Sequence, residues 1–136
     1  MQTIVLGFDD SVEAGKALDR TAELAEAFGA TVLVVSVAPL MQLAGRGIGP
    51  YDPADPPERY RALANEAAAT LKERGIEARA TTALGDAGGT IVELADQNRA
   101  DLIVLGMSHH PHLARIFGGV GEDVAHHAPC DVLLVH

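Results

Sequence analysis

The stretch that decides the fold lies at the end of the chain and opens with the apolar segment DLIVLG, residues 101–106. This segment is short, rich in β-branched residues and closed by a glycine, which predicts a fully buried strand that feeds a loop. The loop MSHHPH (107–112) follows, then GGVG (118–121), a predicted helix over 122–127 and CDVLLV (130–135), which predicts a second buried strand. Because unpaired N–H groups at a helix start attract anions, the strand, glycine-rich loop and helix form a candidate phosphate site.

Apolar runs and helical patterns alternate along the rest of the chain. The predicted strands cover residues 3–8, 31–37, 76–84, 101–105 and 130–135, and the predicted helices cover 10–28, 58–74, 90–99 and 122–127. Asp10 is the predicted N-cap of the first helix, because Glu13 completes a capping box. The alternating pattern of 76–84 indicates an edge strand, and the proline-rich stretch 39–57 predicts irregular structure. Since parallel neighbours need crossover helices, we predict one α/β domain over residues 1–136 with an open parallel sheet.

Composition limits the possible partners and the compartment. A net charge of −9 and a pI near 4.9 argue against a nucleic-acid or anionic-membrane surface, which needs clustered Lys and Arg. Cys130 is the only cysteine, so no internal disulfide forms, and we interpret it as a small buried hydrophobic residue. The sequence has no signal-peptide pattern and no apolar stretch of about 20 residues that would span a bilayer. We therefore expect a cytoplasmic protein.

The segments that carry a resemblance to a known family are IVLGFDDS (4–11), DLIVLG, GGVGEDV (118–124) and HAPCDVLLV (127–135). The chain resembles the universal stress proteins over essentially its whole length. The resemblance implies a Rossmann-like fold of the adenine nucleotide alpha hydrolase type, a single-domain open sheet of five parallel strands in the order 3-2-1-4-5 with helices on both faces. In such sheets the ligand binds beyond the carboxyl ends of the strands where the winding reverses, here between strands one and four.

The nucleotide-binding signature of that family is Gly, two residues, Gly, nine residues, Gly, then Ser or Thr, and this sequence departs from it. With Gly106 as the first glycine and no gap, His109 replaces the second glycine, Gly119 is the third, and Val120 replaces the hydroxyl residue. With one residue deleted from the loop, Gly118 is the third glycine and Gly119 replaces the hydroxyl residue, and we prefer this alignment. In both alignments the second glycine and the hydroxyl are missing, which weakens the inference of ATP binding.

The resemblance implies that the residues matching Asp9 and Val37 hold the adenine and ribose, while the loop from Gly106 to Val120 wraps the phosphates. Carried over position by position, the candidate site residues are Gly7, Asp9, Val37, Gly106, Ser108, His109, Gly118, Gly119 and Val120. The implied ligand is ATP or another adenine nucleotide, with or without Mg²⁺. From the residues alone, Asp9 is equally well a turn or capping carboxylate, and Val37 a plain core residue.

Other chemistry receives less support from the sequence. The glycine-rich turn at 85–89 is either a second phosphate contact or, more simply, a flexible helix entry. A metal site needs three or four converging ligands, whereas the adjacent His109 and His110 are not expected to converge, so we predict none. Arg115 either pairs with a terminal phosphate or is solvated. His126 and His127 suit the negative end of a helix.

We expect no enzyme, because the sequence has no nucleophile elbow, no Walker-type phosphate loop and no zinc-protease helix, although slow ATP hydrolysis remains an alternative. The function that the resemblance implies is a stress-response signalling or adaptor module that binds an adenine nucleotide and unidentified protein partners. The alternative is a dimeric interaction protein of the same fold without nucleotide. The segment Val132 to His136 is an apolar strand at the edge of the expected sheet, and the resemblance implies a homodimer through this segment.

Overall fold

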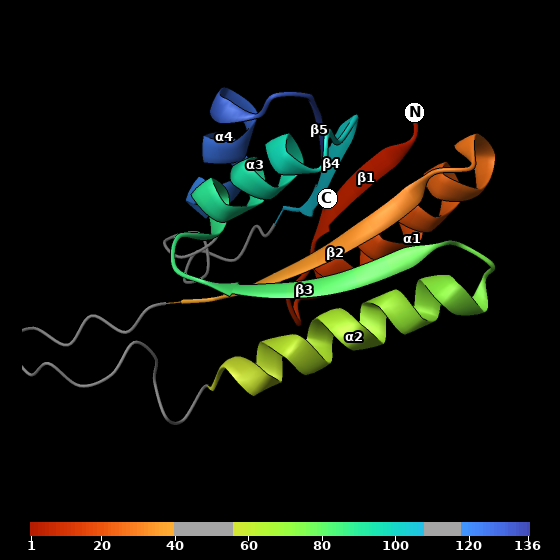
Figure 1. Ribbon diagram of the computed structural model, residues 1–136. Helices are drawn as coiled ribbons and strands as arrows, with labels where there is room; N and C mark the ends of the chain where they lie inside the picture. The colour runs from red at the N-terminus through yellow and green to blue at the C-terminus, as the bar shows by residue number, and fades with distance from the viewer. Residues whose placement is uncertain (40–55, 108–117) are drawn as a thin grey trace, which may run out of the picture.

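A computed structural model describes residues 1–39, 56–107 and 118–136 of the chain (Figure 1). Its elements are β1 (Thr3–Gly7), α1 (Val12–Phe28), β2 (Thr31–Ala38), α2 (Pro57–Glu73), β3 (Ala78–Leu84), α3 (Ala87–Gln97), β4 (Leu102–Gly106), α4 (Gly118–His127) and β5 (Asp131–Val135). Strands and helices alternate as predicted. Most of the proline-rich stretch 39–57 and of the loop after Met107 lies outside the described residues. No helix in the described part of the chain is long and apolar enough to cross a membrane.

The five strands form one parallel sheet in the order β3-β2-β1-β4-β5, which confirms the expected fold (Figure 1). β1 lies at the centre, with Val5 in register with Leu33 of β2 and with Ile103 of β4. β3 and β5 are the two edges, as the alternating pattern of residues 76–84 and the resemblance had indicated. The prediction of a buried strand at 130–135 is wrong, because an edge strand has one neighbour only and the β5 side chains are half-buried or exposed. The order therefore reverses at β1, between its neighbours β2 and β4.

Helices cover both faces of the sheet, and the alternating side chains of each strand supply one core to each face. Ile4 and Leu6 of β1 pack in a cluster with α1 and α2, whereas Val5 packs in the cluster of α3 and α4. The α1 and α2 surfaces that meet the sheet are built largely from alanines, including Ala17 and Ala64, neither of which is exposed. Small side chains let these helices lie close to the strands, which accounts for a core almost without aromatic residues.

The capping residues differ from the sequence prediction at the first helix. Ser11, not Asp10, is the N-cap of α1, because its Oγ accepts a hydrogen bond from the Ala14 N–H at 3.0 Å. The Asp10 carboxylate instead pairs with the Arg59 guanidinium. The Glu13 pattern indicated a capping box one residue too early, because Ser and Asp are both good caps and stand side by side. The predicted C-terminal glycine, Gly29, is confirmed with a φ of 66°.

Two other helices begin earlier than predicted. α3 begins at Ala87 rather than Thr90, because the Asp86 carboxylate accepts a hydrogen bond from the Gly89 N–H at 3.0 Å and caps the helix. α4 begins at Gly118 rather than Glu122. In both cases glycines that read as loop from the sequence lie inside the first helical turn, so the low helix propensity of glycine did not mark the helix start.

Asp101 links β4 to the central strand β1 at the point where both strands begin. Its carboxylate accepts hydrogen bonds from the N–H groups of Gln2 and Thr3 at 2.7 and 2.9 Å. These two bonds lower the pKa of Asp101 below its ordinary value of 3.8, because they favour the ionised form. The Asp101 N–H in turn donates to the Thr3 carbonyl at 2.8 Å. The entry to β4 is thus tied to the first residue of β1.

Gly106, at the end of β4, allows the start of α1 to pack directly on the strand. A Cβ at Gly106 would lie 2.5 Å from the carbonyl carbon of Glu13 and 2.6 Å from the nitrogen of Ala14, both of them backbone atoms. Real Cβ atoms do not approach that closely, so any side chain here forces α1 away from the sheet. The glycine that the sequence assigned to a phosphate loop is therefore also required by packing.

We predict that Gly106→Ala lowers the free energy of unfolding by about 1–3 kcal/mol, because the added methyl group overpacks a backbone contact that cannot yield. Urea denaturation followed by circular dichroism measures the effect. Gly15→Ala is the matched control. Gly15 lies in α1 with no atom within 4 Å of the added Cβ, so this change should raise stability by about 0.5–1 kcal/mol. Equal stability of Gly106→Ala and the unmodified protein would contradict the packing role.

Candidate functional site

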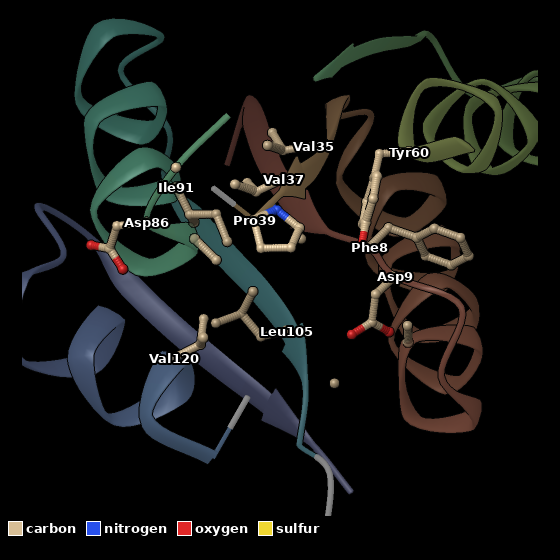
Figure 2. A pocket seen from close by; sticks show the side chains of 15 residues that line it. Phe8, Asp9, Val35, Val37, Pro39, Tyr60, Asp86, Ile91, Leu105 and Val120 are labelled. Atoms are coloured by element: carbon tan, nitrogen blue, oxygen red, sulfur yellow. The ribbon is translucent and has the colours of Figure 1, made fainter. Parts of the chain in front are cut away.

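A crevice of about 250 Å³ opens beyond the carboxyl ends of β1 and β4, where the strand order reverses (Figure 2). Parallel strands bring all their carboxyl ends to one edge of the sheet, so segments far apart in the sequence meet there. The lining residues are Gly7, Phe8, Asp9, Ala14, Val35, Val37, Pro39, Tyr60, Gly85, Asp86, Ala87, Ile91, Leu105, Gly106 and Val120. We refer to this set as the crevice.

The middle of the crevice is apolar. Val35 and Val37 project from β2, Leu105 from β4, Ile91 from α3 and Val120 from α4 (Figure 2). These side chains also belong to, or pack against, the core between the sheet and the α3–α4 pair. The crevice is therefore an opening of the hydrophobic core at the end of the sheet, and it suits a flat, weakly polar group.

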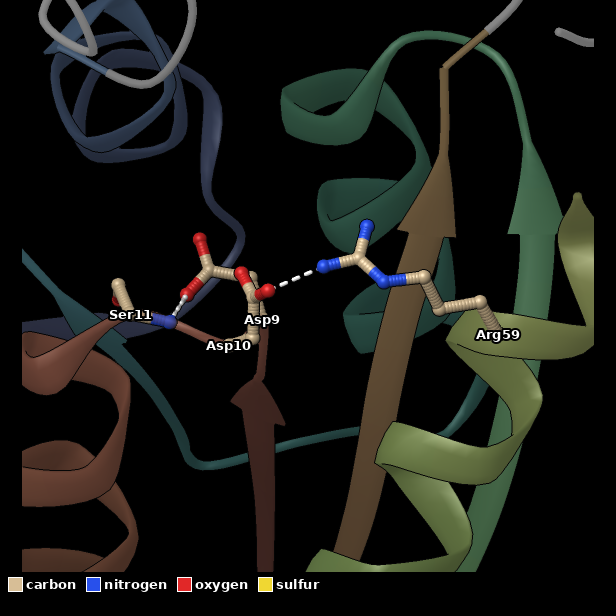
Figure 3. Close-up of polar contacts among 4 residues, drawn as sticks. All are labelled: Asp9, Asp10, Ser11 and Arg59. Carbon is tan, nitrogen blue, oxygen red and sulfur yellow. Dashed lines mark hydrogen bonds and ion pairs between the residues drawn. The ribbon is translucent and has the colours of Figure 1, made fainter. Parts of the chain in front are cut away.

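Asp9 places a carboxylate at one side of this apolar region. It follows β1 directly, and its Oδ1 accepts a hydrogen bond from the Ser11 N–H at 2.9 Å (Figure 3). This is an Asx-type turn, so the turn interpretation of Asp9 is correct. Asp9 also lines the crevice, so the ligand interpretation is compatible with it. The turn fixes the carboxylate, which keeps further lone pairs for hydrogen-bond donors of a ligand.

Asp86 stands on the opposite side of the crevice, in the turn between β3 and α3 (Figure 2). Gly85 precedes it with a φ of 124°, a conformation that favours glycine, and donates its N–H to the Ala38 carbonyl at 3.0 Å. This bond holds the turn against the end of β2. Gly85 and Asp86 line the crevice while Gly88 and Gly89 lie within α3, so the glycine-rich turn is a structured helix entry beside the site.

Tyr60 brings the first turn of α2 to the crevice (Figure 2). Tyr60 lies in the helix predicted over residues 58–74, and nothing in the local sequence pattern indicated a binding site there. Its neighbour Arg59 forms an ion pair with Asp10, the residue after Asp9 (Figure 3). The start of α2 is thereby fastened to the turn that carries Asp9.

Two glycines of the crevice are constrained by close packing. A Cβ at Gly7 would lie 2.4 Å from Cδ2 of Leu105 and 3.1 Å from Cδ1 of Ile91, so its absence leaves room for two crevice side chains. Gly106 is held against α1 as described above. Gly119, in the first turn of α4, differs from both, since a Cβ there would have no atom within 4 Å.

The predicted site residues divide into three groups. Gly7, Asp9, Val37, Gly106 and Val120 line the crevice together. Gly118 and Gly119 begin α4 directly before Val120, and Gly119 is not among the described lining residues. Ser108 and His109, together with Arg115 and the histidines at 110 and 112, lie outside the described residues.

Metal and thiol chemistry find no support in the described part of the chain. It holds no group of three or more His, Cys, Asp or Glu side chains that is arranged to bind a metal ion. Partial burial, and then the charges of Asp131 and Asp101, raise the pKa of the Cys130 thiol above its ordinary value. A protonated thiol is a poor nucleophile, which agrees with the interpretation of Cys130 as a packing residue.

Comparison with known families and structures gives a consistent result. The sequence model of the universal stress protein family matches residues 1–136. The universal stress protein Rv1636 of Mycobacterium tuberculosis (strain ATCC 25618 / H37Rv) is 30% identical over 142 residues, which cover 99% of this chain and 96% of the relative.

Two solved structures are similar over nearly the whole chain. A universal stress protein in complex with cAMP is 26% identical, with a TM-score of 0.75, over 99% of this chain and 97% of that one. The universal stress protein from Archaeoglobus fulgidus in complex with dAMP is also 26% identical, with a TM-score of 0.74, over 100% of this chain and 98% of that one.

Proposed function

Because the chain belongs to the universal stress protein family, we propose that it binds an adenine nucleotide in the crevice at the carboxyl ends of β1 and β4. The observation that carries the proposal is the crevice itself, an apolar opening at the reversal point of the sheet with a fixed carboxylate beside it. Similar structures hold cAMP and dAMP, which are both adenine nucleotides with a single phosphate.

Each part of the ligand has a counterpart in the described residues. The adenine ring fits the apolar walls that Val37, Leu105 and Val120 provide. The ribose hydroxyls donate hydrogen bonds to the Asp9 carboxylate, which the turn to Ser11 holds in place. The phosphate lies at the N-terminus of α4, where the first backbone N–H groups have no partner within the helix and the helix dipole favours an anion.

We assign the protein to signalling or adaptor function rather than catalysis. The ionisable side chains among the described lining residues are Asp9, Tyr60 and Asp86, a set without a nucleophile paired to a base. The ligand is ATP or another adenine nucleotide, with or without Mg²⁺, and the occupied state is recognised by protein partners. The single cysteine suits a reducing compartment, and we place this role in the cytoplasm.

Calorimetric titration with ATP, ADP, AMP and cAMP tests the proposal, and at least one of them should bind with a Kd below about 1 mM. Asp9→Ala should weaken binding about tenfold or more, because it removes a charged acceptor of the ribose hydroxyls. Asp9→Asn retains an acceptor for the Ser11 N–H and separates the loss of charge from the loss of the turn. If no adenine nucleotide binds the unmodified protein, the nucleotide part of the proposal is abandoned.

The hydroxyl that the family signature carries is missing here, and the structure suggests how to restore it. Gly119→Ser adds a hydroxyl to the first turn of α4, where the new Cβ meets no atom within 4 Å. One additional hydrogen bond to phosphate should tighten nucleotide binding about three- to tenfold. Gly15→Ser, in the first turns of α1 and equally open, is the control and should leave the Kd unchanged. Equal affinities of all three proteins would place the phosphate elsewhere.

The second candidate function is a dimeric interaction protein, and the exposed edge of β5 favours it. The Met107 N–H donates to the Val135 carbonyl at 2.7 Å, so the peptide groups of Val135 face β4. Adjacent residues of a strand point their peptide groups to opposite sides, so those of Val132 and Leu134 face away from the sheet. An edge that presents unpaired groups on an apolar strand pairs readily with its own copy across a two-fold axis. We therefore propose a homodimer through Val132 to His136.

Leu134→Pro should shift the protein toward the monomer, because it removes an outward-facing N–H while leaving the hydrogen bonds to β4 in place. Light scattering at tens of micromolar protein measures the change, and circular dichroism checks that the fold is retained. The half-buried Leu134 side chain is also lost, so Leu134→Ala, which keeps the N–H, is the control for packing. An unmodified protein that is monomeric at this concentration would rule the dimer out.

A further inference from the structure

We propose that Tyr60 contacts the nucleoside part of the ligand and that the ion pair between Asp10 and Arg59 positions Tyr60 for this contact. The inference rests on the proposed nucleotide site and adds a wall to it that comes from α2. None of the candidate site residues predicted from the sequence lies on this helix. The contact would make the first turn of α2 part of the site.

The position of Tyr60 is the first observation. Its side chain points from α2 into the crevice, on the same side as Asp9 and Phe8 (Figure 2). The remaining walls are aliphatic, so Tyr60 and Phe8 are the aromatic side chains among the described lining residues. If the ribose binds at Asp9, then Tyr60 lies beside the nucleoside. An aromatic ring there covers the flat face of a sugar or a purine, and its hydroxyl adds a hydrogen-bonding group.

The surroundings of Arg59 are the second observation. Its guanidinium pairs with the Asp10 carboxylate (Figure 3), and its guanidinium carbon lies 5.7 Å from the centre of the Tyr60 ring. A cation at that distance from a ring attracts it electrostatically. Asp10 directly follows Asp9, the proposed ribose acceptor, in the sequence. The pair therefore links the residues next to Asp9 and Tyr60, the two groups that would contact the nucleoside.

A second ion pair, whose residues do not line the crevice, serves as a structural comparison. Arg74 at the end of α2 donates to Glu26 near the end of α1 at 2.7 Å. The Asp10–Arg59 pair connects the turn before α1 to the start of α2, whereas the Glu26–Arg74 pair connects the other ends of these two helices. The side chains of both pairs are similarly exposed. Exposed pairs contribute little to stability. The Asp10–Arg59 pair differs in its position, because it lies next to the crevice and beside an aromatic ring that lines it.

Tyrosine fluorescence makes the contact measurable. The chain has no tryptophan and two tyrosines, so in a Tyr51→Phe background all the tyrosine emission comes from Tyr60. Titration with AMP, and separately with ATP, should change this emission saturably with the Kd that calorimetry gives. Excitation on the long-wavelength side of the tyrosine band avoids adenine absorption. Tyr60→Ala should weaken binding about tenfold, and Tyr60→Phe less, because Phe keeps the ring.

The two kinds of failure are distinguishable. If calorimetry detects nucleotide binding while Tyr60 emission stays constant and Tyr60→Ala binds normally, the contact is refuted and the proposed function stands. If calorimetry detects no binding at all, the proposed function fails and this inference fails with it.

Variants of the two ion pairs test the positioning role of Arg59. Arg59→Ala and Asp10→Asn should each weaken nucleotide binding and change the emission of Tyr60 in the free protein, and their combination should do no more than either one. Arg74→Ala, which removes the remote pair, should leave both quantities unchanged. Equal effects of Arg59→Ala and Arg74→Ala on the Kd would show that Arg59 only holds the two helices together, and would overturn the positioning role.

Discussion

The crevice depends on one contact between backbones, that of the end of β4 with the start of α1 at Gly106. Because no side chain separates them, the N-terminus of α1 lies close against the sheet and Ala14 reaches the crevice. Gly7 does the same for the neighbouring strand by leaving room for Leu105 and Ile91. The absence of these two side chains leaves room for the surrounding groups, and core residues line the apolar middle of the opening.

The crevice collects its residues from distant parts of the chain because all strands are parallel. Asp9, Val37, Asp86 and Gly106 each follow or end a different strand, and the parallel sheet brings them to one edge. Other lining residues come from helices: Ala14 from α1, Tyr60 from α2, Ile91 from α3 and Val120 from α4. Next to Tyr60, Arg59 pairs with Asp10 in the turn after β1. The strand ends and the helices packed on the sheet together form the crevice.

Patterns that reflect burial were readable from the sequence, and those that depend on tertiary contacts were not. The apolar runs predicted every strand to within about two residues, and the strand order followed from the resemblance to the family. The sequence predicted Asp10 as the N-cap in place of Ser11, because both residues are good caps and they are adjacent. What distinguishes them is the pairing of Asp10 with Arg59, 49 residues away, which the local sequence does not reveal. Tyr60 is not among the candidate site residues that the sequence indicates, since helical periodicity does not distinguish a face that meets the sheet from one that borders an opening.

The hydrogen bonds of Asp101 to the first residues of the chain have a consequence for synthesis on the ribosome. β1 is the central strand, yet one of its two neighbours, β4, begins almost a hundred residues later. While the nascent chain is shorter than that, β1 pairs with β2 alone and presents an open edge. Contacts so distant in sequence make folding slow, and the exposed strand is a target for chaperones. The centre of the finished sheet is thus among the last parts of the molecule to become protected.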